Sequence, residues 1–303
     1  MLGAGIVGLA SAVRLAEAGH RVRVVAASTG ADTTSTVAAA VWYPYRAAPQ
    51  DKVTRWSAET FRELSALAAD PATGVRMRWG RELFRVPTAD PWWRSAVPSW
   101  QRLDSVPDGY ADGFRLPVPV ADMPRHLAWL SARLDAHGAV VDRRFLAAIP
   151  SEGDVVVNCT GLGARTLVPD SSVRAVRGQV VVVEQFGLTE WLIDQNDEVN
   201  LTYLVPREET VVLGGTAEED NEDLTADPAT AAAIVQRCAA LVPQAARARV
   251  VAHRVGLRPV RPTVRLEVEY RDRPVVHCYG HGGSGVTLAY GCAQDVVRLV
   301  STM

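Results

Sequence analysis

The sequence predicts an α/β fold in which two domains are interleaved along the chain. Helical and strand-like stretches alternate in the early part of the 303 residues, which is typical of βαβ units. The middle of the chain is rich in strand-like stretches, which favours an α+β domain built on a mainly antiparallel sheet. We therefore expect the chain to cross between the domains several times, with one cleft between them for ligands.

The chain opens on a glycine turn, Met1-Leu2-Gly3-Ala4-Gly5-Ile6-Val7-Gly8-Leu9, that leads directly into a helix. Gly3 permits a tight turn, Gly5 lets backbone amides approach a pyrophosphate, and Gly8 lets the helix pack close to the sheet. Gly19 is typical of the position just past a helix C-terminus, and a strand-like alternation follows it. This spacing predicts a Rossmann-like dinucleotide-binding unit, with an ordinary glycine-rich turn as the alternative.

Two features differ from a typical NAD site. The strand before Gly3 is only Met1-Leu2, which is typical of a chain that lacks its native first residues. After the second strand, Val25-Ala26-Ala27-Ser28 stands where a ribose-binding Asp or Glu is expected. The nucleotide is therefore expected to be held by other contacts, and an NAD-dependent dehydrogenase is the weaker alternative.

The composition argues against several classes of protein. A formal net charge of −2 gives no reason to expect nucleic acid or an acidic membrane surface as a partner. No apolar run reaches membrane-spanning length, and the start lacks the charged segment of a signal peptide. The cysteines lack metal-ligand spacing, so we expect reduced thiols, no metal site and a cytoplasmic protein. They are Cys159, Cys238, Cys278 and Cys292.

The remaining elements follow from periodicity and end signals. The hydroxyl-rich and small residues of 32–45 suit a backbone that lies against a flat ligand, although a loop entering a helix explains them equally well. The Pro- and Trp-rich stretch 70–121 is expected to form strands and loops of the second domain. Helices are expected at 51–69, 123–136, about 227–241, and from about 284 to beyond 297. Strands are expected at 20–25, 154–161, 179–184, and in a hairpin of 201–205 with 210–213.

The most informative segment lies near the C-terminus. The run is Val255-Gly256-Leu257-Arg258-Pro259-Val260-Arg261-Pro262. The nearby prolines restrict the backbone around Arg258, which suits a guanidinium that pairs with a carboxylate. A surface ion pair is the ordinary alternative. The strand from Val275 ends in glycines before a helix starts near Ser284, so it forms a second helix N-terminus that can hold negative charge.

Together these motifs resemble the D-amino-acid oxidase family over nearly the whole chain. The matching stretches are 3–8, 37–45, 157–161, 177–179, 203–206, 258–262 and the specific signature 275–293. The resemblance implies a discontinuous Rossmann-like FAD-binding domain at 1–48, 139–178 and 250–303, and a substrate-binding domain at 49–138 and 179–249. It also implies FAD as cofactor, a D-amino acid and dioxygen as partners, and a monomer or homodimer.

The resemblance assigns roles to individual residues. Arg258 is expected to pair with the substrate carboxylate, assisted by the hydroxyl of Tyr203, although cross-strand packing is the alternative for Tyr203. The carbonyl of Gly283 is expected to receive the substrate ammonium, and Val205 to lie in the same pocket. The backbone amide of Val41 is expected to face flavin N5. The other residues expected to contact FAD are Gly3, Ala4, Gly5, Ile6, Val7, Gly8, Thr34, Ser35, Ala38, Ala39, Ala40, Trp42, Thr160, Gly161, Gly282, Gly283, Ser284, Gly285, Val286 and Thr287.

The implied reaction is oxidative deamination, in which hydride transfer to flavin N5 leads to a 2-oxo acid, ammonia and hydrogen peroxide. No side chain is expected to act as an acid or base, so His277 and His281 are expected to be structural. The second active-site tyrosine of the family is missing, because Val199 and Ala217 stand at its two usual positions.

The resemblance also bears on the substrate. Ala217 occupies the place of an arginine in family members that take acidic substrates. The three acids that follow it are expected to repel a second substrate carboxylate; the alternative is that they point to solvent and only the missing arginine counts. We therefore expect neutral D-amino acids, with bulky and basic side chains as further candidates, rather than D-aspartate. The alternatives are a D-aspartate oxidase, a glycine or secondary-amine oxidase on the same fold, and a non-catalytic flavin-binding module.

Overall fold

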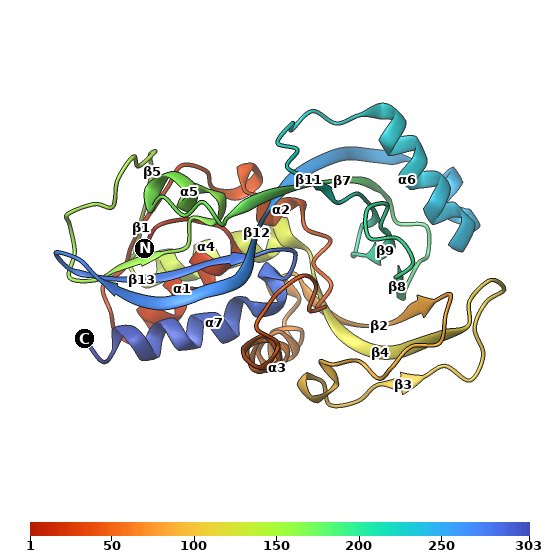
Figure 1. Cartoon of the computed structure of the whole chain (residues 1–303), viewed down its shortest axis with the longest axis horizontal. Coiled ribbons are helices and arrows are strands. Elements are labelled where there is room, and N and C mark those ends of the chain that lie inside the picture. Colours follow the sequence, from red (N-terminus) through yellow and green to blue (C-terminus); the bar gives the residue numbers. More distant parts are fainter.

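A computed structural model describes all 303 residues, which form two lobes joined by long strands (Figure 1). The helices are α1 (Ile6–Glu17), α2 (Thr34–Val37), α3 (Gln50–Leu67), α4 (Met123–Ala136), α5 (Ala164–Leu167), α6 (Pro228–Leu241) and α7 (Gly285–Val300). The strands are β1 (Arg23–Ala26), β2 (Val75–Phe84), β3 (Gln101–Arg102), β4 (Asp112–Ala121), β5 (Val140–Arg143), β6 (Val156–Asn158), β7 (Arg174–Glu184), β8 (Trp191–Asp194), β9 (Thr202–Pro206), β10 (Thr210–Gly214), β11 (Glu218–Glu219), β12 (Val250–Tyr270) and β13 (Pro274–His281). None of the helices combines the length and the apolar character needed to cross a bilayer.

The first lobe has the parallel pairings expected of a nucleotide-binding unit. Strand β1 pairs with β5 and β6 pairs with β13, both in parallel. Leu2 forms parallel bridges to Val25 and Asn158, so it fills the place between β1 and β6. The predicted first strand is therefore reduced to a single bridging residue. Helix α1 packs against α7 and α4 over the largest apolar cluster of the protein.

The second lobe holds most of a large, mainly antiparallel sheet, as predicted. Its path is β3-β4-β2-β8-β9-β10-β7-β12-β13-β6, with β2 and β8 paired in parallel. The predicted hairpin is formed by β9 and β10, and Tyr203 lies opposite Gly214 in it. A separate cluster of apolar residues around Trp42, Trp93 and Trp191 fills the space inside this lobe.

The predicted helices are confirmed, with small shifts at their ends. Helix α4 spans the predicted residues, while α3 and α6 each begin or end within two residues of the predicted bounds. Gly19, just past α1, has φ +91°, the left-handed conformation expected after a helix end.

The segment around Arg258 belongs to a much longer strand than the sequence indicates. Strand β12 runs for 21 residues, pairing with β7 over its first half and with β13 over its second. Figure 1 shows β7 and β12 running together from one lobe into the other. The predicted domain boundaries at 178/179 and 249/250 fall inside β7 and at the start of β12, so both lobes share these strands.

Candidate active site

A cavity of about 520 Å³ is lined by residues of both lobes, a volume typical of small-molecule sites. Almost all of the residues that the sequence predicts for the site line this cavity. Three do not: Trp42, Val205 and Ser284. The cleft expected between the two domains is therefore present, and the predicted residues meet in it.

The first wall is the N-terminus of α1. This helix has no acidic residue in its first turn and no side-chain cap from Gly5, and the Ile6 N–H donates to Ser35 Oγ at 3.0 Å. A Cβ on Gly8 would lie 2.1 Å from the Gly3 carbonyl oxygen, and Gly3 itself has φ +99°. Close packing here requires glycine, and the free end of the helix suits an anionic group such as a pyrophosphate.

The second wall is the N-terminus of α7, which also has no acidic residue in its first turn. Ser284 Oγ accepts from the Tyr45 N–H and donates to the Tyr45 carbonyl, each at 2.5 Å. Thr287 Oγ1 makes the same pair of bonds to Tyr43, at 3.0 and 2.9 Å. Both hydroxyls therefore fix residues 43–45 against α7. Ser284 therefore positions Tyr45, which lines the cavity, and does not line the cavity itself.

The segment before Tyr43 contains an unpaired backbone amide at the cavity wall. Ala40, at φ +62°, accepts from the Ala121 N–H at 3.0 Å, and the Trp42 N–H donates to the Pro119 carbonyl at 2.9 Å. The amide of Val41, which lies between them, makes no hydrogen bond within the chain. An unpaired amide in a strained turn at a cavity wall is typical of a ligand contact.

Trp42 and Val205, the other two predicted residues that do not line the cavity, belong to the hydrophobic core. Trp42 is buried and donates its indole N–H to the Ser57 carbonyl at 3.0 Å. Val205 is fully buried and packs with Val180 and Val212, two residues along β9 from Tyr203. Their packing, rather than a ligand, accounts for these two side chains.

Arg258 lies at the cavity wall without a carboxylate partner. Its Nη1 donates to the Thr216 carbonyl at 3.0 Å, and no acidic side chain of the chain is within ion-pair distance. The guanidinium lies flat on Gly178, where an added Cβ would be 2.5 Å from Nη1. Nearby, the ring of Tyr203 packs on Gly214, and burial raises the pKa of its hydroxyl. A half-buried arginine without a counter-ion is suited to an anionic ligand.

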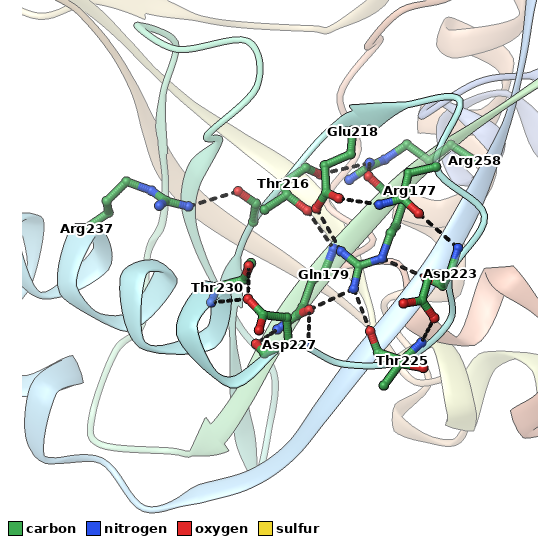
Figure 2. A network of polar contacts seen from close by, with 12 residues as sticks. Arg177, Gln179, Thr216, Glu218, Asp223, Thr225, Asp227, Thr230, Arg237 and Arg258 are labelled. Carbon is green, nitrogen blue, oxygen red and sulfur yellow. Dashed lines mark hydrogen bonds and ion pairs between the residues drawn. The ribbon is translucent and has the colours of Figure 1, made fainter.

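A polar network behind Arg258 fixes its position (Figure 2). Arg177 is 3% exposed and donates to Glu218 at 2.7 Å and to Gln179 at 3.0 Å. The Gln179 N–H donates to Thr216 Oγ1 at 3.0 Å, while the carbonyl of Thr216 accepts from Arg258. The conformation of Arg258 therefore depends on the loop that this network holds against β7.

The acids after Ala217 face away from the cavity, as in the second of the two predicted alternatives. Glu218 pairs with Arg177, and Asp220 lies 3.4 Å from Arg174. Glu219 also has an arginine, Arg46, at 3.4 Å. None of the three acids lines the cavity. Their charges are largely cancelled, so they give little reason to expect repulsion of a substrate carboxylate.

The positions of the missing tyrosine also lie outside the cavity wall. Val199 is 53% exposed, whereas Ala217 is buried. Each belongs to the segment that leads into or out of the β9–β10 hairpin, and the Ala217 N–H donates to the Val199 carbonyl at 2.8 Å. Neither side chain contacts the ligand space.

His277 and His281 are buried, and burial lowers the pKa of both. Burial lowers the pKa of His281 to about 4, and this residue lines the cavity. His277 is also buried, which lowers its pKa, and its Nε2 lies 3.0 Å from Glu269. Neither ring is placed as a charged group toward the ligand, in keeping with the structural roles predicted for them.

The cysteine thiols are all free and buried. Burial raises the pKa of Cys238 to about 12, and the neighbouring Cys278 thiol together with burial raises the pKa of Cys159. Because the thiolate is the reactive form, we expect iodoacetamide to leave unchanged, under native conditions, the oxidase activity that the resemblance implies. Oxygen uptake after increasing times of alkylation measures this. Inactivation that runs ahead of unfolding, as followed by circular dichroism, would contradict it.

Several cavity residues were missed in the sequence. Tyr43, Tyr45 and Gln195 line the cavity, and so do residues 144–146, which follow β5. Residues 144–146 could have been predicted from the sequence. They follow β5, which pairs in parallel with β1, and parallel strands end at the same edge of a sheet. No local signal marks Gln195, which reaches the cavity only through the pairing of β8 with β9.

The chain is similar to known proteins over almost its whole length. The family described as FAD dependent oxidoreductase, DAO, matches residues 2–299. A D-amino-acid oxidase of Rubrobacter xylanophilus is 48% identical over 99% of this chain and 94% of the relative. A D-amino-acid oxidase of Streptomyces coelicolor is 46% identical over 99% of this chain and 96% of the relative.

A solved structure shows the same fold. The glycine oxidase of Geobacillus kaustophilus superposes with a TM-score of 0.84 at 21% identity, covering 99% of this chain and 93% of the other. The predicted family, fold class and cofactor are thereby confirmed. The chain belongs to the DAO family of FAD-dependent oxidoreductases.

Proposed function

We propose that this enzyme oxidises D-amino acids to 2-oxo acids, ammonia and hydrogen peroxide. The observation that carries the proposal is Arg258, a cavity-lining arginine without a carboxylate partner, beside the hydroxyl of Tyr203. The two relatives that are 46–48% identical over nearly their whole length are both D-amino-acid oxidases, which supports the same activity here.

The residues that would hold FAD are those at the two helix N-termini. The amides of α1 beyond Gly5 suit the pyrophosphate, while the start of α7 and the amide of Val41 suit the flavin. FAD, when bound, supplies the oxidant: it accepts a hydride and passes the electrons to dioxygen. The chain itself contributes position and electrostatics.

Three groups would orient the substrate. Arg258 and the Tyr203 hydroxyl bind its carboxylate, and the carbonyl of Gly283 accepts a hydrogen bond from its amine. With these groups fixed, the Cα hydrogen of one enantiomer would face bound FAD, and that of the other enantiomer would point away from it. Stereospecificity therefore follows from the placement of the carboxylate and amine sites, without an acid or base side chain.

The same cavity disfavours a second carboxylate on the substrate. Arg144 and Arg258 are its only cationic side chains, and Arg144 follows β5 at the nucleotide end. A D-aspartate side chain would therefore be desolvated without a cation to pair with. This supports neutral, bulky or basic D-amino acids as substrates in preference to D-aspartate.

We expect the catalytic efficiency for D-aspartate to be about tenfold or more below that for D-alanine, the cost of an unpaired buried charge. The measurement is peroxide release with D-aspartate, D-alanine, D-leucine, D-arginine, glycine and sarcosine under identical conditions. A D-aspartate value equal to the others would contradict the preference. Glycine or sarcosine as the best substrate would instead favour the alternative amine oxidases.

A further inference from the structure

A buried carboxyl group lies behind Tyr43, one of the residues that line the cavity. Glu82, on β2, is 1% exposed, yet no arginine or lysine lies within ion-pair distance of it. Burying a carboxylate without a counter-charge is costly, so such a group is either kept protonated or receives a cation from a ligand. Burial raises its pKa to about 7, which places both states within reach at neutral pH.

Two cavity-lining residues connect Glu82 to the ligand space. The Tyr43 hydroxyl donates to Glu82 Oε1 at 2.5 Å, and Gln195 Nε2 donates to the Tyr43 hydroxyl oxygen at 3.0 Å. Both Tyr43 and Gln195 line the cavity. The side-chain oxygen of Gln195 receives no hydrogen bond, so it can accept one from a ligand.

The position of this network matches the far end of a substrate side chain. Tyr203, beside the carboxylate site, pairs with Ile193 on β8, and Gln195 follows two residues later. At the rise of a strand this is a separation of about 7 Å along β8. The four-carbon stem of a lysine side chain spans such a distance.

The charged neighbours of Glu82 are occupied elsewhere. Next to it on β2 and β4, Arg81 and Arg115 both pair with Glu190. On β8, Asp194 accepts from the Tyr110 hydroxyl and lies 3.8 Å from Arg85. Within the chain, therefore, Glu82 has only neutral partners, and the positive charge that it lacks can come from the cavity.

We propose that Glu82, with Tyr43 and Gln195, forms the end of the substrate site that accepts a positively charged side chain. The preferred substrates are then D-amino acids with a terminal ammonium or guanidinium group. This inference rests on the proposed oxidation of D-amino acids and names the substrate class. Tyr43 and Gln195 would contact the cation directly, while Glu82 supplies the charge behind them.

The test compares D-lysine with D-norleucine, which has the same stem without the charge. The ratio of their kcat/KM values cancels the ionisations that both substrates share. We expect this ratio to rise about tenfold from about pH 5.5 to about pH 8.5, because Glu82 loses its proton near pH 7 while the lysine ammonium stays charged. A ratio independent of pH would overturn the proposal.

Two variants assign the effect to the network. Glu82→Gln is expected to lower the ratio about tenfold at pH 8.5 and to abolish its pH dependence. Tyr43→Phe removes a hydrogen bond to the ionised carboxylate, so the midpoint of the pH dependence should move upward. Glu184→Gln, at an exposed carboxylate that pairs with Arg249 outside the cavity, is the matched control and should keep the native profile.

The outcomes separate this inference from the proposed function. If Glu82→Gln keeps the native ratio and profile, Glu82 does not select the side chain. If that variant fails to fold, an unshifted midpoint in Tyr43→Phe overturns the proposal instead. If the native enzyme releases no peroxide with either D-norleucine or D-lysine, the proposed function itself fails.

Discussion

Arg258→Ala is expected to retain FAD and to lose about 2–5 kcal/mol of transition-state stabilisation toward D-amino acids. The loss corresponds to a fall in kcat/KM of about 30-fold or more. The reason is that Arg258 is the only cation at the substrate end of the cavity, and its guanidinium already lies flat on Gly178 and is tied to the Thr216 carbonyl. Arg258 therefore needs little reorganisation to bind a carboxylate. Removing its side chain leaves the substrate carboxylate without a partner.

Oxygen uptake and the flavin absorption spectrum together measure this prediction. Arg254→Ala is the matched control, since Arg254 lies four residues earlier on β12 and is exposed outside the cavity. The control should have native efficiency and native FAD content. Near-native efficiency in Arg258→Ala would show that the carboxylate site is elsewhere.

Gly8→Ala is expected to have the second large effect, on cofactor binding and on stability. The new Cβ would lie 2.1 Å from the Gly3 carbonyl oxygen, so either the glycine turn or the start of α1 must move. Both form the wall that suits the pyrophosphate. We expect FAD affinity to fall by about 100-fold or more, with a destabilisation of about 1–3 kcal/mol, typical of overpacking.

Fluorescence titration of the apoprotein with FAD and thermal unfolding measure the two effects. Ser11→Ala, one turn later on α1, is the control because its buried hydroxyl has no hydrogen-bond partner. It should bind FAD normally and be at least as stable as the native chain. Native FAD affinity in Gly8→Ala would mean that this turn does not contact the cofactor.

Local signals explain why much of the fold could be predicted. Helix α4 ends as expected because Gly138 follows it in the left-handed conformation, with φ +71°. The β9–β10 hairpin is visible from its alternation. Strand β12 was not predictable at its full length, because it depends on pairing with β7 and β13, which are distant in sequence.

In the site, too, features that depend on local sequence could be predicted, and features that depend on contacts distant in sequence could not. Glycines whose Cβ would collide with backbone, such as Gly3 and Gly8, can be recognised from their spacing. Strand alternation places Tyr203 and Val205 on the same side of β9, and both the cavity and the hydrophobic core lie on that side. Alternation therefore cannot show which of the two Val205 faces. Nor does it show that Glu218 is paired with Arg177, a contact that forms only when β11 joins β7.

The central claim is that this chain binds FAD and a D-amino acid in one cavity, with Arg258 holding the substrate carboxylate. The most direct test is anaerobic mixing of the FAD-bound protein with D-alanine or L-alanine, followed by flavin absorbance. We predict that the oxidised flavin band is lost with D-alanine alone and that Arg258→Ala slows this loss by about 30-fold or more. Equal bleaching by both enantiomers, or by neither, would contradict the claim.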